Sequence, residues 1–426
     1  MSKIAVIGGG ASGMCAALAA AEAGAEVYLF EHNDRLGKKL AATGNGKCNL
    51  GNAVYTDACY RGDGAFAKKV FDIMSPEAVR DYLIVHGLPL RDRRGYFYPH
   101  SEQAASVVTF FASRLTLHGV RILLSSEVTG VKAEDRGFSV RFCSSDGAKQ
   151  TLFADRVIVS AGGLAGENLG AGGIGYDIAK TFGHHVTPLF PALVQLMCKD
   201  SGTKKISGVR TDASVRLHTD TGGVSRVFNE TGEILFTDYG ISGIPVLMLS
   251  RYAGDALMNR GTAEIALDFF PDRSAEELSA MIGSLLSESG NGTQNRQNSV
   301  IPDSVSTEDM LAGLLPKKLL YKILCDAKVP AERPFSELTR KETNRMVSLM
   351  KAFRLPVTGT RDYPSAQVTA GGIETSEIDS RTLESRLQKG IYFTGELLNV
   401  DGTCGGYNLQ FAFATGILAG IAASEE

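Results

Sequence analysis

The N-terminal stretch constrains the fold of this chain most, because two strands, a helix and a glycine-rich turn follow one another in a fixed order. Residues 3–7 read KIAVI, a short apolar run typical of a buried parallel strand. The turn after them places Gly8, Gly10 and Gly13 in a G-x-G-x-x-G pattern. An Ala- and Leu-rich stretch then predicts a helix, and EVYLF predicts a second strand. This order predicts a Rossmann-like α/β domain that binds a dinucleotide.

Each residue of the pattern has a mechanical role. Gly8 permits a tight turn, Gly10 lets a pyrophosphate approach the backbone, and Gly13 lets the helix pack closely on the strand. The N-terminus of the helix offers unpaired N–H groups and a positive dipole end to phosphates. Glu31, at the end of the second strand, can accept hydrogen bonds from a ribose. The alternative is a glycine-rich turn without a ligand. The pattern by itself suits both NAD and FAD.

The sequence after the second strand favours FAD. HNDRLGKKLAATGNGKCNLGN is not the next strand–helix repeat of a simple NAD domain. It is a basic turn followed by a loop of small residues, whose backbone N–H groups can reach a flat ring or a phosphate. Lys39 could meet the charge of the pyrophosphate, and Lys47 could favour negative charge on a reduced flavin.

The C-terminal part carries a second cofactor motif. GIYFTGE reads as a strand that runs into a turn, and a helix then begins around Tyr407 or Asn408. Gly405 and Gly406 would lie close to the flavin, and the helix dipole would point at its pyrimidine end. The alternative is a plain amphipathic C-terminal helix. DRVIVSAGG, residues 155–163, predicts another buried strand that ends in small residues, against which a cofactor can lie.

With these motifs the chain resembles the BaiN/aminoacetone-oxidase-like family of FAD-binding flavoproteins, also called YhiN-type. The matching stretches are VIGGGASGM, LGKKLAATGNGKCNLGN, RRGYFYPHSEQAASVV, VIVSAGG, GYDIAKTFGHHV, PALVQL, GEILFTDYGISGIPVLMLSR, QVTAGGI and GIYFTGELLNVDGTCGGYNLQFAFATG. The family pattern often has Arg at the position of Lys47 and Asp at that of Asn399. Both departures lie in predicted cofactor loops and bear on the tuning of the flavin.

The resemblance implies one FAD, held without a covalent bond. It places the phosphates at residues 11–13, the ribose at Glu31, the flavin ring near residues 44–49 and 405–409, and the adenine beside Val128. The predicted cofactor-binding residues are Gly8, Gly10, Ala11, Ser12, Gly13, Glu31, His32, Lys39, Thr43, Gly44, Asn45, Gly46, Lys47, Cys48, Asn49, Val128, Ala161, Gly162, Gly163, Gly395, Glu396, Asp401, Gly405, Gly406, Tyr407, Asn408 and Leu409.

The predicted fold class is α/β, with a Rossmann-like, glutathione-reductase-like FAD domain that an insertion splits. Residues 1–188 and 365–426 would form this domain. Short strands with turn residues between them predict an inserted β-rich, barrel-like domain over residues 189–272 and 353–364. Helical patterns predict a helical domain over residues 273–352, with a polar loop at residues 290–304.

A second G-x-G-x-x-G, GAGGIG at residues 170–175, tests the prediction of a single dinucleotide site. No strand precedes it and no acid-ended strand follows its helix, so we do not expect a second Rossmann site. NAD(P)H would then act as a transient donor that reaches the flavin through the substrate opening.

The composition of the chain limits the kinds of partner that we expect it to bind. A formal net charge of -3 and a pI near 6.2 do not favour nucleic acid, which usually selects a basic stripe. The seven cysteines are scattered without a C-x-x-C pair, as expected of free thiols in a reducing cytoplasm. No uninterrupted apolar run reaches the roughly 18 residues of a membrane span. We expect a cytoplasmic protein with a small-molecule substrate, no nucleic acid, no membrane and no metal; the oligomeric state stays open.

One side chain outside the cofactor motifs is a candidate for catalysis. Tyr239, in FTDYGISG, could donate a proton or clamp a carbonyl; the alternative is a half-buried structural tyrosine. Cys48 and Cys404 lie in flavin loops, where packing is the favoured role. The pair His184 and His185 lacks further ligands at metal spacing and is interpreted as structural.

The leading functional hypothesis is an FAD-dependent oxidoreductase that reduces a C=C bond conjugated to a ketone, with NAD(P)H as donor. The resemblance implies a steroid-like substrate, such as a 3-oxo bile acid with Δ4 or Δ4,6 unsaturation. One alternative is an oxidase of a small amine or aminoketone that releases hydrogen peroxide. A second alternative is a flavin-binding protein without turnover. A nucleic-acid-modifying flavoprotein is a more distant fourth hypothesis.

Overall fold

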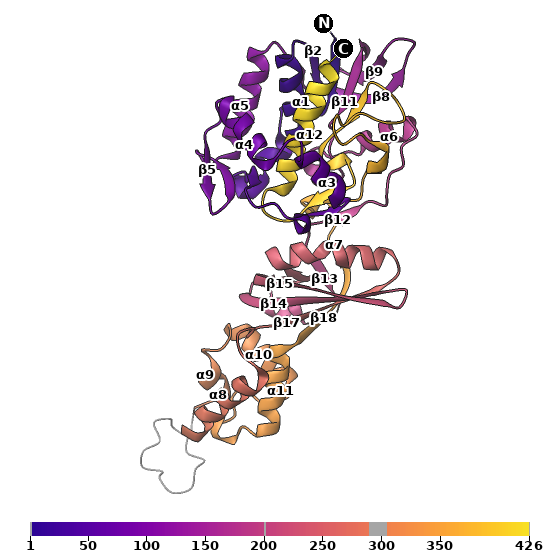
Figure 1. Cartoon of the computed structure of the whole chain (residues 1–426). Coiled ribbons are helices and arrows are strands. Elements are labelled where there is room, and N and C mark those ends of the chain that lie inside the picture. Colours follow the sequence, from indigo (N-terminus) through magenta and orange to yellow (C-terminus); the bar gives the residue numbers. More distant parts are fainter. Residues whose placement is uncertain (1, 200–201, 289–304, 426) are drawn as a thin grey trace. The chain divides into compact units, whose positions relative to one another are not determined.

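The computed structural model describes residues 2–199, 202–288 and 305–425 (Figure 1). The loop predicted at residues 290–304 lies outside the described residues. The chain forms two compact units: unit 1 contains Met1–Pro191 and Tyr363–Glu426, and unit 2 contains Ala192–Asp362. The two ends of the chain therefore fold together, and unit 2 is an insertion between them.

Unit 1 is built on a parallel sheet with the strand order β20-β11-β1-β2-β7. The β-branched and aromatic residues of these strands are almost all buried, as expected of a parallel sheet covered by helices. This sheet confirms the predicted Rossmann-like α/β fold. Its strands are β1 (Lys3–Ile7), β2 (Glu26–Phe30), β7 (Arg121–Leu123), β11 (Arg156–Val159) and β20 (Ile391–Phe393).

The C-terminal helix α12 (Tyr407–Ser424) packs along α1 (Ala11–Glu22), the helix of the nucleotide motif (Figure 1). Glycines allow this close approach: a Cβ added at Gly416 would lie 2.2 Å from the carbonyl oxygen of Ser12. Buried residues surround nearly the whole of α12, so it is not a plain amphipathic surface helix.

The remaining elements of unit 1 surround this core. Its other helices are α2 (Lys38–Ala41), α3 (Gly64–Phe71), α4 (Pro76–Val85), α5 (Ala104–Leu117) and α6 (Ile174–Thr181). Its other strands are β3 (Gly51–Asn52), β4 (Tyr60–Gly62), β5 (Leu90–Arg93), β6 (Tyr96–Pro99), β8 (Glu127–Ala133), β9 (Phe138–Cys143), β10 (Lys149–Ala154), β12 (Phe190–Ala192), β19 (Val368–Ala370) and β21 (Val400–Gly402).

Unit 2 contains a closed antiparallel barrel with the strand order β13-β16-β15-β14-β17-β18. This barrel confirms the predicted β-barrel-like insertion. Its strands are β13 (Leu196–Cys198), β14 (Arg210–Thr221), β15 (Val224–Phe236), β16 (Gly240–Ser242), β17 (Thr262–Asp268) and β18 (Phe353–Thr360). Its helices are α7 (Ile244–Met258), α8 (Ala275–Glu288), α9 (Thr307–Leu311), α10 (Lys317–Asp326) and α11 (Arg340–Lys351).

The barrel and the helices of unit 2 share one hydrophobic cluster, in which Leu267 of β17 and Met350 of α11 both take part. The finer division of the insertion into a β-rich and a helical domain stays a prediction. Among the residues that the structure describes, no helix is long and apolar enough to cross a membrane.

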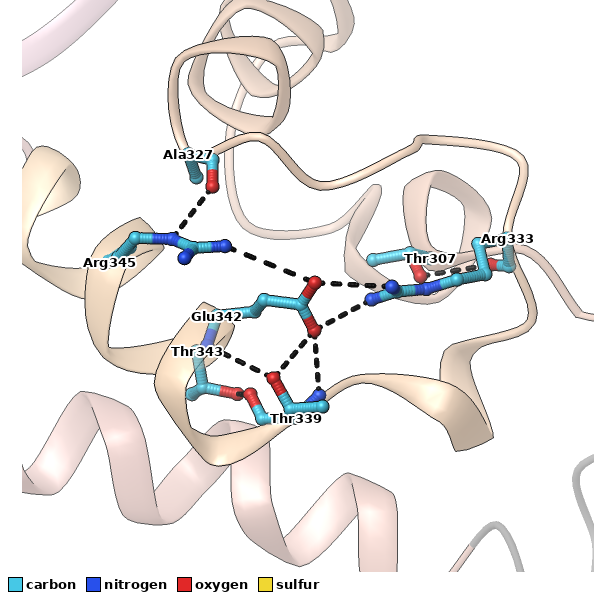
Figure 2. A network of polar contacts seen from close by, with 7 residues as sticks. All are labelled: Thr307, Ala327, Arg333, Thr339, Glu342, Thr343 and Arg345. Carbon is cyan, nitrogen blue, oxygen red and sulfur yellow. Dashed lines mark hydrogen bonds and ion pairs between the residues drawn. The ribbon is translucent and has the colours of Figure 1, made fainter.

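A carboxylate at the start of α11 holds several segments of unit 2 together (Figure 2). Glu342 accepts two hydrogen bonds from the guanidinium of Arg333, at 3.1 and 2.8 Å, and one from the hydroxyl of Thr339, at 2.7 Å. Arg345 extends the network by donating to the carbonyl oxygen of Ala327 at 2.9 Å. Hydrogen bonds from Arg333 and Thr339 lower the pKa of Glu342 to about 2.

We expect Glu342→Gln to lower the free energy of unfolding of unit 2 by about 1.5–3 kcal/mol, because the arginine loses a charged acceptor. The lowered pKa of Glu342 also makes the free energy of unfolding depend on pH. The stabilisation is fully present above pH 4.5 and is lost as the pH falls towards 2. Urea unfolding at several pH values measures both effects, with Glu332→Gln, at an exposed neighbouring carboxylate, as the control. Equal unfolding midpoints for the two variants at pH 7 would contradict the expectation.

Candidate functional site

The nucleotide turn has the geometry that its glycines predict. Gly8 has a φ of +105°, and its N–H donates to the carbonyl oxygen of Phe30 at 2.8 Å. A Cβ added at Gly13 would lie 1.8 Å from the carbonyl oxygen of Gly8. At Gly10, by contrast, an added Cβ would meet nothing within 4 Å, and no side chain caps α1. The N–H groups of Ala11, Ser12 and Gly13, at the start of α1, have no acceptor within the helix, and the open space beside Gly10 leaves room for a pyrophosphate.

The predicted ribose ligand is held firmly. Glu31 is 6% exposed, and its carboxylate accepts from the backbone N–H groups of Gly9 at 2.9 Å and Asn33 at 2.8 Å. The Oε1 also accepts from the Nδ2 of Asn33 at 2.7 Å, whereas the Oε2, bonded to Gly9, has a second lone pair that a ribose hydroxyl can use. The ring of His32, 46% exposed, lies 3.2 Å from Glu31. Ser126 donates to the Glu31 carbonyl oxygen at 2.9 Å, so the segment that leads to Val128 starts beside the ribose ligand.

The second glycine-rich pattern lies against this same place. Its helix is α6, and a short 3-10 helix at Glu167–Leu169 precedes it instead of a strand. A Cβ added at Gly170 would lie 2.4 Å from the Nδ2 of Asn33 and 2.6 Å from the ring of His32. The loop therefore belongs to the surroundings of Glu31 and does not follow the strand–turn–helix order of a Rossmann motif.

Several other predicted cofactor residues, from both parts of the FAD domain, lie at one edge of the parallel sheet. Because β20, β11, β1 and β2 are parallel, their carboxyl ends lie together, and a dinucleotide binds at such an edge. Ala161, Gly162 and Gly163 follow β11, while Gly395 and Glu396 follow β20. Asp401 is 3% exposed and lies in β21, which pairs with β4.

The loop at Thr43–Asn49 has an unusual backbone. Gly44, Asn45 and Cys48 have φ values of 56°, 52° and 58°, so left-handed residues, two of them not glycine, follow closely on one another. Such conformations are costly and concentrate at functional sites. Residues 44–47 are exposed, so the loop can present its backbone to a ligand. Burial raises the pKa of Cys48 to about 11, which keeps its thiol protonated and supports a packing role.

The two predicted flavin loops meet. A Cβ added at Gly406, whose φ is 93°, would lie 2.6 Å from the Oδ1 of Asn49. The side chain of Tyr407 donates to the carbonyl oxygen of Val54 at 3.0 Å, and that of Asn408 donates to Gly402 at 2.8 Å. These side chains fix the loop, while the backbone N–H groups of residues 407–409, in the first turn of α12, remain available to a cofactor.

Two predicted residues from opposite ends of the sequence form an ion pair. The Nζ of Lys39 lies 2.6 Å from the Oε2 of Glu396, and both side chains are partly buried. The other oxygen of Glu396 accepts from the N–H of Thr369 at 2.8 Å. A Cβ added at Gly163 would lie 2.8 Å from Glu396, so the pair borders the small residues after β11. Lys39 is therefore positioned by Glu396, in addition to its predicted role at the pyrophosphate.

We expect Glu396→Gln to weaken FAD binding about fivefold, since a partly exposed pair is worth up to about 1 kcal/mol. Titrating FAD into apoprotein and following flavin fluorescence measures the change. The control is a double-mutant cycle with Lys39→Gln. If the two single changes add without coupling in the double variant, the pair does not support the cofactor.

The two histidines have a structural environment. The Nδ1 of His184 lies 2.9 Å from Glu377, and its Nε2 lies 2.8 Å from the hydroxyl of Ser385. Burial lowers the pKa of His184, whereas the hydrogen bond to Glu377 raises that of the exposed His185. Within the described parts of the chain, no group of three or more His, Cys, Asp or Glu could hold a metal.

Tyr239 lies in unit 2, whereas the predicted cofactor residues lie in unit 1. Its ring is half-buried. The guanidinium of Arg361 lies 4.8 Å from the ring centroid and makes a cation–π contact. Its role as proton donor stays a prediction.

Sequence reasoning missed several residues of these sites. Gln410 accepts from the N–H of Asn52 at 3.0 Å and donates to its carbonyl oxygen at 3.1 Å. The hydroxyl of Thr369 accepts from the N–H groups of Leu164 and Ala165. Both residues lie inside stretches that carry the family resemblance, but their partners are distant in sequence. No local pattern indicates such partners.

Comparisons with known proteins agree with this geometry. The sequence profile of the family described as "HI0933-like protein Rossmann domain" matches residues 2–422. The "3-dehydro-bile acid delta(4,6)-reductase" of Clostridium scindens is 39% identical, with 100% of both chains covered. The "Ribosomal RNA dihydrouridine synthase" of Escherichia coli is 28% identical, with 96% of this chain and 95% of that protein covered. A 3-ketosteroid delta1-dehydrogenase from Sterolibacterium denitrificans matches in structure with a TM-score of 0.51, 12% identity and both chains fully covered, which shows the shared fold.

Proposed function

The chain belongs to the HI0933-like family of FAD flavoproteins, and from this premise we propose that it reduces a C=C bond conjugated to a carbonyl group. The observation that carries the proposal is a chemical feature common to two full-length relatives. A 3-oxo-Δ4 bile acid and a uridine both contain a C=C bond conjugated to a carbonyl. The names of the two relatives describe the reduction of such bonds.

The residues of unit 1 fit FAD, and each has a task in this proposal. The start of α1 binds the pyrophosphate, and Glu31 binds the ribose. The start of α12, with Gly405 and Gly406, stabilises negative charge at the pyrimidine end. When bound and reduced by NAD(P)H, FAD would supply the hydride. Tyr239 then donates the proton that the α-carbon of the substrate requires.

We propose a flat, steroid-like enone as the substrate. The reductase from Clostridium scindens supports this choice, because it is 39% identical over the whole of both chains. The bile acid in its name is a 3-oxo compound with the Δ4,6 unsaturation that the proposed chemistry needs.

A uridine in RNA is the second candidate, and a cavity in unit 2 favours it. This cavity is a widely open depression of the surface, lined by Arg340, Lys341 and Arg345, with Asp326 as the one acid among its lining residues. Asp326 forms an ion pair with Lys322, so the lining has an excess of positive charge. Two of the cations lie in the first turn of α11, where the helix dipole disfavours them. A phosphate backbone would compensate this charge.

The test uses the holoprotein without oxygen. NADH or NADPH should bleach the oxidised flavin absorbance, and an enone steroid should restore it. If a uridine-containing ribosomal RNA fragment restores it instead, the second candidate replaces the first. If neither NADH nor NADPH reduces the flavin, the reductase proposal is wrong. Oxygen uptake with a small amine would then support the oxidase, and no turnover at all would support a flavin-binding protein.

A further inference from the structure

Tyr96 is placed rigidly beside the loops that carry the predicted flavin residues. It begins β6, which pairs with β5 on one side, where Tyr96 faces Arg93. On the other side β6 pairs with β3, where Tyr96 faces Asn52. β3 follows directly after the loop at Thr43–Asn49. A residue that lies between two paired strands has little backbone freedom, so the point from which its ring projects is defined.

The ring of Tyr96 lies beside Gly405 of the second flavin loop. A Cβ added at Gly405 would lie 3.4 Å from the Cε1 of Tyr96. The Nδ2 of Asn52 donates to the carbonyl oxygen of the same glycine at 3.4 Å, which ties β3 to this loop. Tyr96 therefore lies in the part of unit 1 where the two predicted flavin loops meet.

The exposure of this ring is not explained by packing. Tyr96 is 41% exposed, whereas its neighbour Phe97 is 4% exposed and belongs to the interior. In the parts of the chain that the structure describes, no hydrogen bond of the Tyr96 hydroxyl is found. An exposed aromatic ring that is held rigidly beside a cofactor loop offers a flat apolar face at little entropic cost.

We propose that Tyr96 is the substrate-stacking residue of this protein, the wall against which the flat conjugated carbonyl compound lies. This inference rests on the proposed function and names the residue that positions the substrate. A steroid-like enone and a uracil base both present a flat face, and a tyrosine ring packs on either. Stacking on an aromatic ring strengthens binding by roughly 5- to 100-fold.

The location is tested with a tryptophan. The chain contains no Trp, so Tyr96→Trp creates a single tryptophan that can be excited selectively. Phe153→Trp on β10, at a site 64% exposed, is the matched control. FAD is titrated into each apoprotein. The inference expects strong quenching of the emission in Tyr96→Trp and clearly weaker quenching in Phe153→Trp. Equal quenching of the two emissions would overturn it.

The role is tested with Tyr96→Leu, which keeps an apolar side chain but removes the aromatic face. We expect KM for the enone steroid, or for the uridine-containing RNA, to rise about 5- to 100-fold. The kcat should change far less than KM, and Tyr96→Phe should restore KM. If KM stays as in the wild type, the inference fails while the proposed function stands. If the wild type reduces neither substrate, the proposed function fails, and the stacking role fails with it. Stronger quenching in Tyr96→Trp would then show only that Tyr96 lies beside FAD.

Discussion

Replacing Gly13 by alanine is expected to yield a protein that is purified without FAD and unfolds at a lower temperature. The added Cβ would lie 1.8 Å from the carbonyl oxygen of Gly8, 3.1 Å from its carbon and 3.2 Å from the Cβ of Ser160. The closest neighbours are backbone atoms of a turn that is itself bonded to β2, so they cannot move aside. Instead α1 must shift away from β1, and its N–H groups leave the place where the pyrophosphate would bind.

We expect this variant to bind FAD more than 100-fold more weakly, because both the phosphate site and the packing of α1 are lost. Flavin absorbance per protein and thermal unfolding followed by circular dichroism measure the two effects. Gly10→Ala is the matched control. Its Cβ would meet nothing within 4 Å, so that variant should unfold like the wild type and lose affinity only for FAD. A Gly13→Ala protein that keeps FAD and its melting temperature would contradict the reading of the turn.

This contrast between two glycines shows what a sequence can reveal. The nucleotide motif is predictable because its residues interact over short distances in the chain, where turn, dipole and packing set the residue types. The barrel of unit 2 is predictable in outline, because alternating residues and turns mark its strands. The position of the C-terminal helix follows from its glycines only after α1 is seen beside it, since Gly416 and Gly420 meet the backbone of that helix.

The structural features that were not predicted from the sequence fall into two kinds, each with its own physical cause. Helix α7 was not predicted, although Pro245 in its first turn and the apolar spacing of Val246, Leu249 and Ala253 are signals of a helix. This helix signal is local, but it lies among the strand patterns that predict a β-rich domain here. The ion pair of Lys39 with Glu396 is different. Its members are 357 positions apart, and only the fold brings the ends of β20 and of α2 together.

Tyr239→Phe is expected to lower kcat of the proposed reduction by about 10²- to 10⁴-fold, the usual contribution of a positioned acid. The phenol would donate the proton that the α-carbon takes up, and phenylalanine keeps the ring but not that proton. The cation–π contact of Arg361, 4.8 Å from the ring centroid, survives this change. We therefore expect the variant to fold normally and its flavin to be bleached by NAD(P)H at the wild-type rate.

Separating the half-reactions decides between the two readings of this tyrosine. In the oxidative half, the reduced variant should return to the oxidised state slowly with substrate, and KM should change little. Tyr252→Phe, at a tyrosine stacked on Phe228 in the same unit, is the control and should behave as the wild type. Arg361→Gln should lower kcat less than Tyr239→Phe, because it removes only the contact that orients the ring. A wild-type kcat in Tyr239→Phe would assign the residue to packing, and the proton would then have to come from water or from another side chain.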